Sequence, residues 1–546
     1  MEQSRSSISD LTFPITRSEL VRRIGSPRQR RRFRRARVVT AVLTALVLIS
    51  TALGVVVGWP RLVCGTGLQQ IRGECVGVND GAHSFESGIG GITDRIHSMN
   101  TEVEEIAASE GNAQAFRIVI MGSFSQIENA DLSDDQITSA VGGAYSALMQ
   151  LNGFTETESG VERASGGRAV FQLYLANEGS VQQGTGAVVN NLESMVHDDI
   201  PLSLVIGQSS TTTQTEEAAR ELSDIGIPMI ASSSTSTTIN HENSPGLIRA
   251  APNNEDFAAA IRDHLDRNAE SDEEPVRGRL LTDSNEGDTF SRDLAEQFSR
   301  YLDPYLSPGE LSYRGYAGEE GEQFDFGHLA AEICRDGDTN AVFFAGRHSD
   351  LEDFLAAAHD YRCGDGDSPP LTVYAMELGL LPGLEETYST KQCDPTDDPA
   401  SEHYRLVQAS AFDPAWLDED ADSPVGFRGY TSAMEETLGT SPSEDFHDDY
   451  SLIYYDAATI AVRATLLGDS PDDEDTLASE VREHLFRVTE SPTGSGELEY
   501  LEELDGRVTG RYVPILSSDC SAETTDAEPF QTPNVSYEEL YPDLAD

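Results

Sequence analysis

Short apolar runs alternate with amphipathic segments along most of the chain, starting at Phe116. Strand-like runs occur at residues 116–122, 168–179, 201–208, 227–232, 278–287, 341–346 and 371–376. Between them, apolar residues recur at helical spacing at residues 133–153, 184–198, 215–226, 253–267, 291–302 and 326–337. This alternation is typical of βαβ units and predicts a mainly parallel, doubly wound α/β fold. The strands are too numerous for one small sheet, so we expect two Rossmann-like lobes with a ligand cleft between them.

The pattern changes near the C-terminus. Two strand-like runs within residues 494–516 flank Asp505 and Gly506, a pair that favours a hairpin turn. Residues 521–546 are acidic and contain three prolines. Such a composition predicts either a disordered tail or an arm that wraps over the fold.

The N-terminal region has the pattern of a membrane anchor. Residues 38–59 carry no charge, and a helix of this length crosses a hydrocarbon core of about 30 Å. Eleven arginines and three acids precede the run, so the positive-inside rule predicts a cytoplasmic N-terminus and an extracellular C-terminal domain. A cleaved signal peptide is the alternative, but its apolar region is usually about 7–15 residues long. We expect an uncleaved, single-pass signal-anchor in the cell membrane.

These patterns divide the chain into six predicted parts. They are a basic cytoplasmic tail (1–37), the transmembrane signal-anchor (38–59), a juxtamembrane stalk with a cysteine loop (60–112), lobe 1 (113–252 and 413–487), lobe 2 (253–412 and 488–518) and an acidic C-terminal tail (519–546).

The charge is strongly negative, with 95 acidic against 37 basic residues and a net charge of −58. The only lysine is Lys391, and the acids are spread over the whole exported part. None of the acidic stretches has the ligand spacing of a helix–loop–helix calcium site. A solvated acidic surface of this kind suits a protein that works in high salt, where ions screen its self-repulsion. We therefore expect a halotolerant source.

All six cysteines lie outside the apolar run, which suits an oxidising compartment. Cys64 and Cys75 would close a small loop beside the membrane. Cys334 and Cys363 each end a helix-like segment that precedes a strand, so a parallel sheet would bring them to one edge. Cys393 and Cys520 then pair by elimination. Buried free thiols are the alternative for these residues.

Signatures of catalysis are mostly absent from the sequence. There is no nucleophile elbow, zinc-protease motif, phosphate-binding loop or CxxC, and the 11 histidines are scattered. We therefore predict no enzyme activity, no cofactor and no metal site. The arginine-rich N-terminus could contact nucleic acid, but next to a membrane span an orienting and headgroup-binding role accounts for it. No nucleic-acid partner is predicted.

Two hydroxyl-rich loops follow neighbouring strands. One lies within residues 208–214, and the other runs without interruption from Ser232 to Thr238. In open α/β sheets, ligands bind beyond the carboxyl ends of strands, where helix N-termini offer free N–H groups to a carboxylate. Serine and threonine also cap helices in any protein, so one such loop would be explained by capping. Two in succession favour a ligand-binding wall.

The order of segments from Phe116 to Leu516 resembles the type I periplasmic-binding-protein fold. The resemblance rests on the hydroxyl loops, on "LIRAAPNNEDFAAAI", "DTFSRDLAEQF", "AVFFAGRHSDLEDFL" and "YDAATIAVRA", and on the closing "SGELEYLEELDGRVTGRYVPIL". It is similar to the leucine/isoleucine/valine-binding branch of ABC-transporter substrate-binding proteins, in a membrane-anchored, acidic form of actinobacterial type. The resemblance implies two α/β lobes that close on a small ligand.

The resemblance also implies ligand-binding positions, which fall on Ser210, Thr211, Ser233, Thr235, Phe290, Arg347, His348 and Glu377. The hydroxyl residues would hold an amino-acid-like carboxylate, and Glu377 would pair with the ligand ammonium. Phe290 stands where the family usually has a tyrosine. Arg347 and His348 stand where the family usually has an aromatic residue, a departure that argues against an ordinary aliphatic amino acid.

The first functional hypothesis is a membrane-anchored extracellular sensor or solute receptor for a small polar ligand, amino-acid-like or amide. Its partners would be the membrane and an ABC permease or a signalling protein. The second is a structural or interaction ectodomain that keeps the fold without a ligand. The ligand's identity and the choice between transport and sensing are not encoded in a recognisable pattern.

Overall fold

A computed structural model describes most of the chain from Cys64 onward. The described residues are 64–85, 89–109, 113–125, 132–155, 169–207, 211–269, 275–315, 324–361, 370–381, 384, 404–418, 421–439, 449–468, 476–488, 491–518 and 529–544. Residues 65–546 form one unit by their internal contacts. The predicted signal-anchor at residues 38–59 lies outside the described residues. Within the described part, no helix has both the length and the apolar character of a membrane span.

The first sheet has seven strands in the order β1-β2-β4-β3-β5-β6-β7. Their bounds are β1 Leu68–Ile71, β2 Glu74–Asn79, β3 Gln114–Gly122, β4 Ala169–Asn177, β5 Leu202–Gly207, β6 Met229–Ala231 and β7 Leu247–Arg249. Strands β3 to β7 pair in parallel, while β1 and β2 run antiparallel at the edge. The chain reverses its direction of winding at β3, which makes the gap between β3 and β5 the switch point of lobe 1.

Strands β1 and β2 correct the predicted boundary of lobe 1. Residues 60–112 were expected to form a stalk, but Gly77, Val78 and Asn79 of β2 pair with β4 of the first sheet. The side chain of Asn177 on β4 also donates to the carbonyl oxygen of Cys75, at 2.8 Å. β1 and β2 are only four and six residues long and pair antiparallel, so they lie outside the strand–helix alternation that marks the parallel core.

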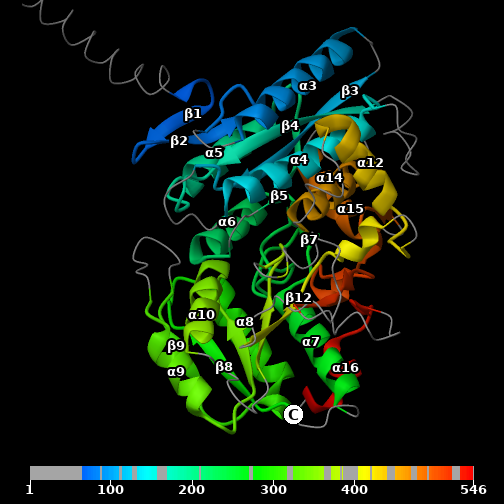
Figure 1. Ribbon diagram of the computed structural model, residues 1–546. Helices are drawn as coiled ribbons and strands as arrows, with labels where there is room; N and C mark the ends of the chain where they lie inside the picture. Colours follow the sequence, from blue (N-terminus) through cyan, green and yellow to red (C-terminus); the bar gives the residue numbers. More distant parts are fainter. Residues whose placement is uncertain are drawn as a thin grey trace, which may run out of the picture. The chain divides into compact units, whose positions relative to one another are not determined.

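Helices cover both faces of the first sheet (Figure 1). They are α3 Gly90–Ser109, α4 Asp134–Leu151, α5 Thr185–Met195, α6 Thr213–Asp224, α12 Phe427–Leu438, α14 Asp449–Leu467 and α15 Leu477–His484. α14 packs closely on α4, and a Cβ on Gly143 would stand 1.9 Å from the carbonyl oxygen of Ser451. That contact requires a glycine, and it brings a helix from late in the sequence into lobe 1.

The second sheet has six strands in the order β17-β12-β11-β10-β8-β9. Their bounds are β8 Gly278–Asp283, β9 Leu311–Tyr313, β10 Ala341–Ala345, β11 Leu371–Met376, β12 Tyr404–Ala409 and β17 Ile515–Ser517. All pairs are parallel except β12 with β17. The switch point of lobe 2 lies between β8 and β10.

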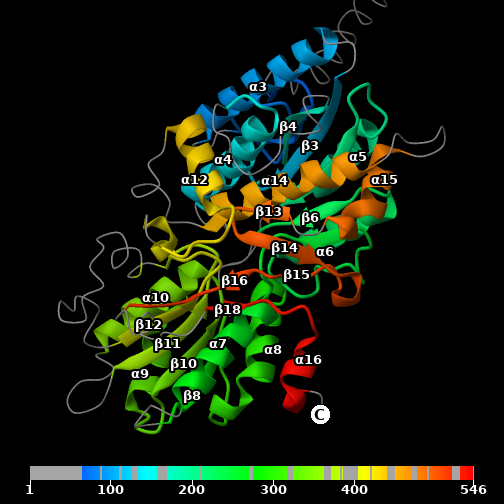
Figure 2. The same cartoon turned by 90° about the vertical axis from the view of Figure 1, so that its right-hand side faces the viewer.

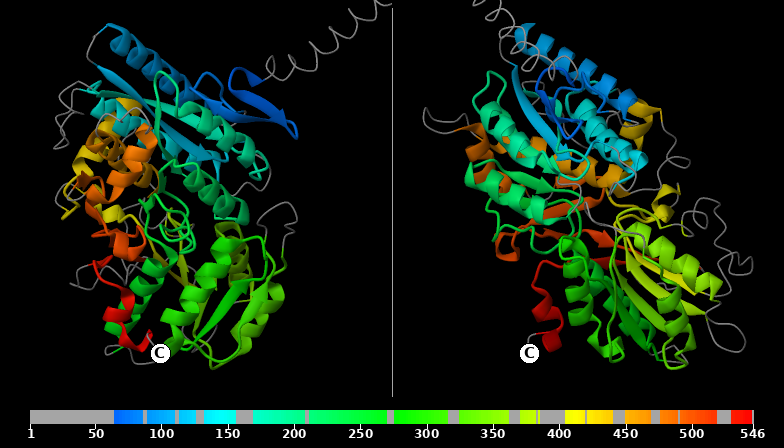
Figure 3. Two further views of the ribbon diagram at one scale, coloured as in Figure 1. Left: turned by 180° about the vertical axis from the view of Figure 1, so that it is seen from behind. Right: turned by 90° about the vertical axis from the view of Figure 1, so that its left-hand side faces the viewer.

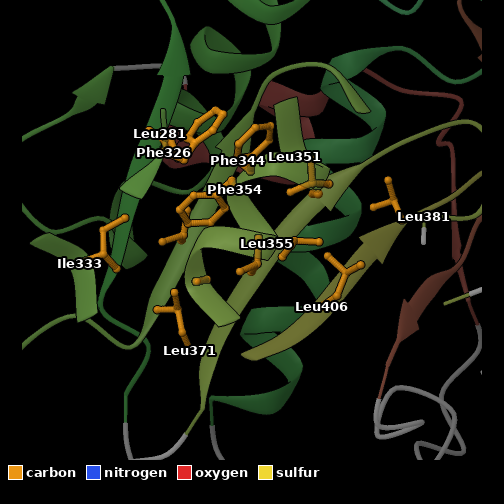
Figure 4. Close-up of a cluster of buried hydrophobic side chains, with 14 of the residues drawn as sticks. Leu281, Phe326, Ile333, Phe344, Leu351, Phe354, Leu355, Leu371, Leu381 and Leu406 are labelled. Carbon is orange, nitrogen blue, oxygen red and sulfur yellow. The ribbon is translucent and has the colours of Figure 1, made fainter. Parts of the chain in front are cut away.

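The helices of lobe 2 are α7 Asn254–Asn268, α8 Thr289–Tyr301, α9 Gly327–Arg335 and α10 His348–Asp360. Figure 3 shows them flanking the second sheet. α9 and α10 cover a core of aromatic and aliphatic side chains that includes Phe326, Phe344 and Phe354 (Figure 4). The two predicted doubly wound lobes are therefore present.

Three segments connect the lobes, at residues 250–253, 410–426 and 510–514, and we call them the first, second and third crossovers. Before the third crossover, β13 Ser491–Thr493, β14 Gly496–Tyr500 and β15 Val508–Thr509 form a small antiparallel sheet. The hairpin predicted around Asp505 and Gly506 is confirmed, because β14 pairs with β15 across these residues. Both have positive φ, at 53° and 76°.

The sequence of the C-terminal tail predicted either a disordered tail or an arm that wraps over the fold. Residues 529–544 form an arm. This segment contains β18 Phe530–Gln531, α16 Tyr537–Leu540 and the 3₁₀ turn η7 Pro542–Leu544. β18 pairs with β16 Tyr512–Val513 of the third crossover. The remaining short 3₁₀ turns are η2 Asp303–Tyr305, η3 Pro414–Leu417, η4 Leu485–Arg487 and η5 Glu502–Leu504.

The described cysteines, Cys64, Cys75 and Cys334, are disulfide-bonded. The expected oxidised state is therefore confirmed for them, against the alternative of free thiols. Cys363, Cys393 and Cys520 lie outside the described residues, so the pairings Cys64–Cys75, Cys334–Cys363 and Cys393–Cys520 remain predictions.

Candidate functional site

The first wall of the candidate site follows β5, at the switch point of lobe 1. Thr211 is 2% exposed, and its Oγ1 has no hydrogen-bond partner among the described residues. Thr212 caps α6 by accepting from the Thr215 N–H at 3.3 Å. Gln182, in the left-handed region at φ 57°, donates to the Thr215 hydroxyl at 2.8 Å and accepts from that of Thr212. The loop after β4 therefore holds the N-terminus of α6, and Thr211 with it, in one orientation.

The second wall is the hydroxyl loop at residues 232–239, and a buried arginine organises it. Arg249, at the end of β7, is 1% exposed and donates to the carbonyl oxygens of Ser234, at 2.5 Å, and of Ser236 and Ile239. Burial lowers the pKa of this guanidinium to about 10, although Asp256 and Asp293 oppose the effect, so it stays charged at neutral pH. The loop therefore keeps a fixed backbone, which presents its hydroxyl groups in set positions.

Ser233 is the hydroxyl of this loop that meets α14. Its Oγ lies 3.1 Å from the hydroxyl of Tyr454, and both side chains are buried. Glu178, directly after β4, is 1% exposed and accepts from the Thr185 hydroxyl at 2.7 Å, while its Oε2 has no partner among the described residues. Burial raises the pKa of Glu178 to about 7, against the hydrogen bond from Thr185. Lobe 1 thus offers hydroxyls and a carboxyl that is protonated below neutral pH.

The edge of lobe 2 is built around an ion pair at its own switch point. Asp288 caps α8 through the Ser291 N–H, at 3.2 Å, and receives two hydrogen bonds of 2.8 Å from Arg347, which precedes α10. The guanidinium of Arg347 lies 4.9 Å above the ring of Phe290. Burial would raise the pKa of Asp288, but Arg347 and the bonds from Ser291 outweigh it, so the pKa is lowered.

The two edges contact each other directly. The carbonyl oxygen of Thr211 accepts from the N–H of Phe290 at 3.3 Å and from Arg347 Nη2 at 3.2 Å. In the hydroxyl loop, Thr237 donates its N–H to Asp293 Oδ2 at 2.9 Å, and its hydroxyl donates to Oδ1 of the same carboxylate. The chain's own groups therefore join the lobes at two points.

Glu377 follows β11 on lobe 2, and α14 connects it to the wall of lobe 1. Its Oε1 accepts from the Leu378 N–H at 3.0 Å and lies 3.5 Å from the hydroxyl of Tyr450. Tyr450 and Tyr454 are four residues apart and therefore lie on one face of α14. That face reaches the carboxylate of Glu377 with one phenol and the hydroxyl of Ser233 with the other.

The predicted site residues have different positions in the structure. Ser210 lies outside the described residues. Thr211, Phe290 and Arg347 meet where the lobes touch, while Ser233 and Glu377 are joined through α14. The structure does not bring Thr235 and His348 to these contacts by any described bond.

Thr235 is 2% exposed, and its carbonyl oxygen accepts from the Asn254 N–H at 2.8 Å, which joins the loop backbone to the first residue of α7. His348 is 34% exposed and lies 3.2 Å from Glu352 one turn along α10. The role predicted for Arg347 also changes, because its guanidinium binds Asp288 of its own lobe and a carbonyl of the other. Arg347 therefore links the two lobes at the edge of the second sheet.

Sequence reasoning missed Glu178, Tyr450 and Tyr454. The two tyrosines carried a usable signal, because polar-tipped aromatics at positions i and i+4 of an otherwise apolar helix mark one face. Glu178 carried none, since one acid among 95 is not distinctive. Chemically, the site offers hydroxyls that donate or accept, the carboxylate of Glu377, which accepts, and the carboxyl of Glu178, which also donates when it is protonated. No group of three or more candidate metal ligands occurs in the described part of the chain.

No protein-family model and no curated protein matches this sequence. Solved structures share its fold at low identity. An amino acid ABC transporter substrate-binding protein from Pseudomonas fluorescens is 15% identical with a TM-score of 0.52, over 79% of this chain and 98% of that protein. An ABC transporter substrate-binding protein from Desulfitobacterium hafniense in complex with Leu is 14% identical with a TM-score of 0.50, over 77% of this chain and 100% of its own.

A third similar structure is the branched-chain amino acid transporter substrate-binding protein LivJ from Streptococcus pneumoniae in complex with isoleucine. It is 13% identical with a TM-score of 0.50, over 77% of this chain and 100% of its own. These likenesses establish the fold of the type I periplasmic binding proteins.

Proposed function

We propose that the protein is an extracellular solute-binding protein that holds a small polar ligand, amino-acid-like or amide, between its two lobes. The observation that carries the proposal is the arrangement on α14, where Tyr454 contacts the hydroxyl wall of lobe 1 and Tyr450 approaches Glu377 of lobe 2. A ligand held there has hydroxyls for its acceptors and a carboxylate for an ammonium or amide group. Proteins of the same fold are described in complex with leucine and isoleucine, which supports this ligand class.

We further propose that residues 38–59 anchor the protein in the cell membrane, with the arginine-rich tail in the cytoplasm. An ABC permease is the partner that the fold relatives suggest, and a signalling protein is the other candidate partner. The surplus of acids over bases supports a protein that works in concentrated salt.

The proposal is tested by calorimetric titration of the full-length protein in detergent and high salt, with a panel of amino acids and amides. We expect one compound class to bind, and Ser233→Ala, Tyr450→Phe and Glu377→Gln each to weaken it about tenfold, a loss of about 1.4 kcal/mol. Glu296→Gln, an exposed glutamate on α8, is the matched control and leaves the affinity unchanged. Affinity that survives all three site variants would refute the site.

A second function has its own supporting observation. The lobes contact each other directly, Arg347 with Thr211 and Thr237 with Asp293. This favours an ectodomain that keeps the closed fold for a structural or interaction role. The same titration separates the two functions, because heat flat across the whole panel supports the ligand-free alternative.

A further inference from the structure

The C-terminal arm, which we define as residues 529–544, attaches to a connection between the lobes and to the outside of lobe 2. Figure 2 shows β18 beside β16 and α16 beside the helices of lobe 2. The arm continues past β17, the last strand of the second sheet. It therefore adds a segment that the two sheets do not need for their own hydrogen bonding.

The first part of the arm pairs with the third crossover. β18 and β16 are antiparallel, with Tyr512 opposite Gln531 and Val513 opposite Phe530. Thr532 extends the pairing through three bonds: its N–H donates to the Arg511 carbonyl at 2.8 Å, its carbonyl accepts from Gly510 at 2.9 Å, and its hydroxyl accepts from the Arg511 N–H at 2.9 Å. The crossover backbone is thus one strand of a two-stranded ribbon.

The second part of the arm is anchored on lobe 2. Tyr537 is 1% exposed, and its hydroxyl donates to Asp256 Oδ1 on α7 at 2.7 Å. The guanidinium of Arg507 lies 4.4 Å above its ring and donates to the Val535 carbonyl at 2.8 Å. Two ion pairs with exposed carboxylates, Arg262–Asp543 at 2.8 Å and Arg300–Glu538 at 2.5 Å, lie along the rest of the arm. The buried tyrosine contributes most of the anchoring, since ion pairs whose carboxylates are exposed to solvent add less.

The third crossover is tied to lobe 1 by Arg511. This side chain is fully buried and donates to Asp456 Oδ2 on α14 at 3.1 Å and to the Ala250 carbonyl of the first crossover at 2.7 Å. Tyr512 also lies against Trp416 of the second crossover, with ring centroids 6.2 Å apart. Residues 510–513 are therefore the point where all three crossovers and both lobes are connected.

We propose that the C-terminal arm braces the third crossover and thereby restricts how readily the two lobes separate. Lobe movement in a hinged protein is absorbed by φ and ψ changes in a few connecting residues. Pairing with β18 fixes those angles at residues 510–513, and Tyr537 fixes the arm to lobe 2. Without the arm, the crossover would have free backbone donors and acceptors and a larger range of conformations. This inference concerns the fold alone, and only its effect on ligand affinity depends on the proposed function.

Hydrogen–deuterium exchange of the full-length protein tests the brace without any ligand. In Tyr537→Ala, we expect exchange of the amides in residues 507–517 to rise at least tenfold, with β3 and β10 unchanged, because local opening becomes easier. Leu540→Ala is the matched control, since Leu540 lies on the same helix and is 46% exposed. If residues 529–544 lose protection while residues 507–517 keep theirs, the brace is refuted.

A milder variant covers the case in which Tyr537→Ala unfolds the whole protein. Thr532→Ala removes the hydroxyl that accepts from Arg511 and leaves the buried tyrosine in place. We expect exchange at residues 510–513 to rise several-fold in this variant, and no rise there overturns the proposal. If a ligand is found, both variants should shift its affinity although neither residue belongs to the candidate site; a failed ligand screen leaves the exchange result intact.

Discussion

Each lobe has an arginine at the sheet edge that faces the other lobe, and the two arginines have different partners. Arg249 in lobe 1 donates to three neutral carbonyl oxygens. Arg347 in lobe 2 instead makes a bidentate pair of hydrogen bonds to the carboxylate of Asp288. One buried carboxyl group in each lobe also differs in whether its hydrogen-bond donor is neutral or charged. Glu178 is bonded by a neutral hydroxyl and has a raised pKa, while Asp288 is bonded by a guanidinium and has a lowered one.

The different partners of Arg249 and Arg347 show two ways in which this fold stabilises a buried guanidinium at the edge of a sheet. Carbonyl oxygens accept the described hydrogen bonds of Arg249, while Asp256 and Asp293 act on its charge without a direct bond, so the geometry of the loop backbone and the charge depend on each other. A counterion holds Arg347, so that edge depends on the ionisation of Asp288. Lobe 1 should therefore respond to pH with the opposite sign from lobe 2, and its arginine should be the harder one to replace.

The largest expected effect follows from replacing Arg249. Arg249→Met removes three charge-assisted hydrogen bonds to buried carbonyl oxygens, of which that of Ser236 keeps the Ile239 N–H as a donor, and each lost bond costs about 1–3 kcal/mol. We expect a loss of about 4 kcal/mol in the free energy of unfolding, measured by denaturant titration. Arg292→Met, at an exposed position on α8, should stay within about 0.5 kcal/mol of the wild type. A small effect at Arg249 would remove the distinction between the two arginines.

Replacing Asp288 should cost less. Asp288→Asn keeps an acceptor for the cap of α8 but leaves Arg347 without its counterion, and we expect a loss of about 2 kcal/mol at pH 7. Because the folded pKa of Asp288 is lowered, its contribution is complete above the unfolded value of about 3.9 and is lost as the pH falls through the folded value. The gap between variant and wild type should therefore close in acid.

A double-mutant cycle with Arg347→Gln isolates the ion pair in lobe 2. We expect a coupling energy of about 1–2 kcal/mol between Asp288 and Arg347 at pH 7, since the carboxylate is fully buried and the guanidinium is 16% exposed. Additive effects of the two substitutions would show that the pair contributes nothing to the edge.

Glu178 should show the opposite pH dependence. Its folded pKa of about 7 lies above the unfolded value, so the folded state binds more protons between about pH 4.5 and pH 7, and stability falls as the pH rises through this window. Glu178→Gln removes the dependence and keeps an acceptor for Thr185. We expect the variant to match the wild type near pH 4.5 and to be about 3 kcal/mol more stable at pH 8. Equal stability of the two proteins at both pH values would contradict the raised pKa.

The smallest effect is expected at the contact between the lobes. Thr237→Val removes the hydroxyl that donates to Asp293 and keeps the backbone N–H that donates to the same carboxylate. We expect a loss of about 1 kcal/mol, the usual value for one hydrogen bond to a partly compensated acceptor. Thr213→Val, at an exposed position on α6, provides the comparison and should change stability by less than about 0.5 kcal/mol.

Much of the fold was predictable because βαβ units follow a local rule. Strands β3 to β6, β8, β10 and β11 lie in or beside the apolar runs, since a parallel strand covered on both faces must be apolar throughout. The positions of Thr211 and Ser233 followed from the same rule, because a loop after such a strand lies at the carboxyl edge of the sheet. The stalk boundary failed because β2 joins the sheet by edge pairing, for which its own sequence has no strong pattern.

The sequence by itself determined the alternating architecture, the hairpin at Asp505–Gly506 and the hydroxyl character of the wall, since each depends on residues near one another in the chain. Only the tertiary structure decided the partners. Ser233 and Tyr454 are 221 positions apart, and Arg347 and Thr211 are 136 apart. A hydrogen bond acts over about 3 Å, so its partner is set by how two lobes and their helices pack, and no local pattern specifies that packing.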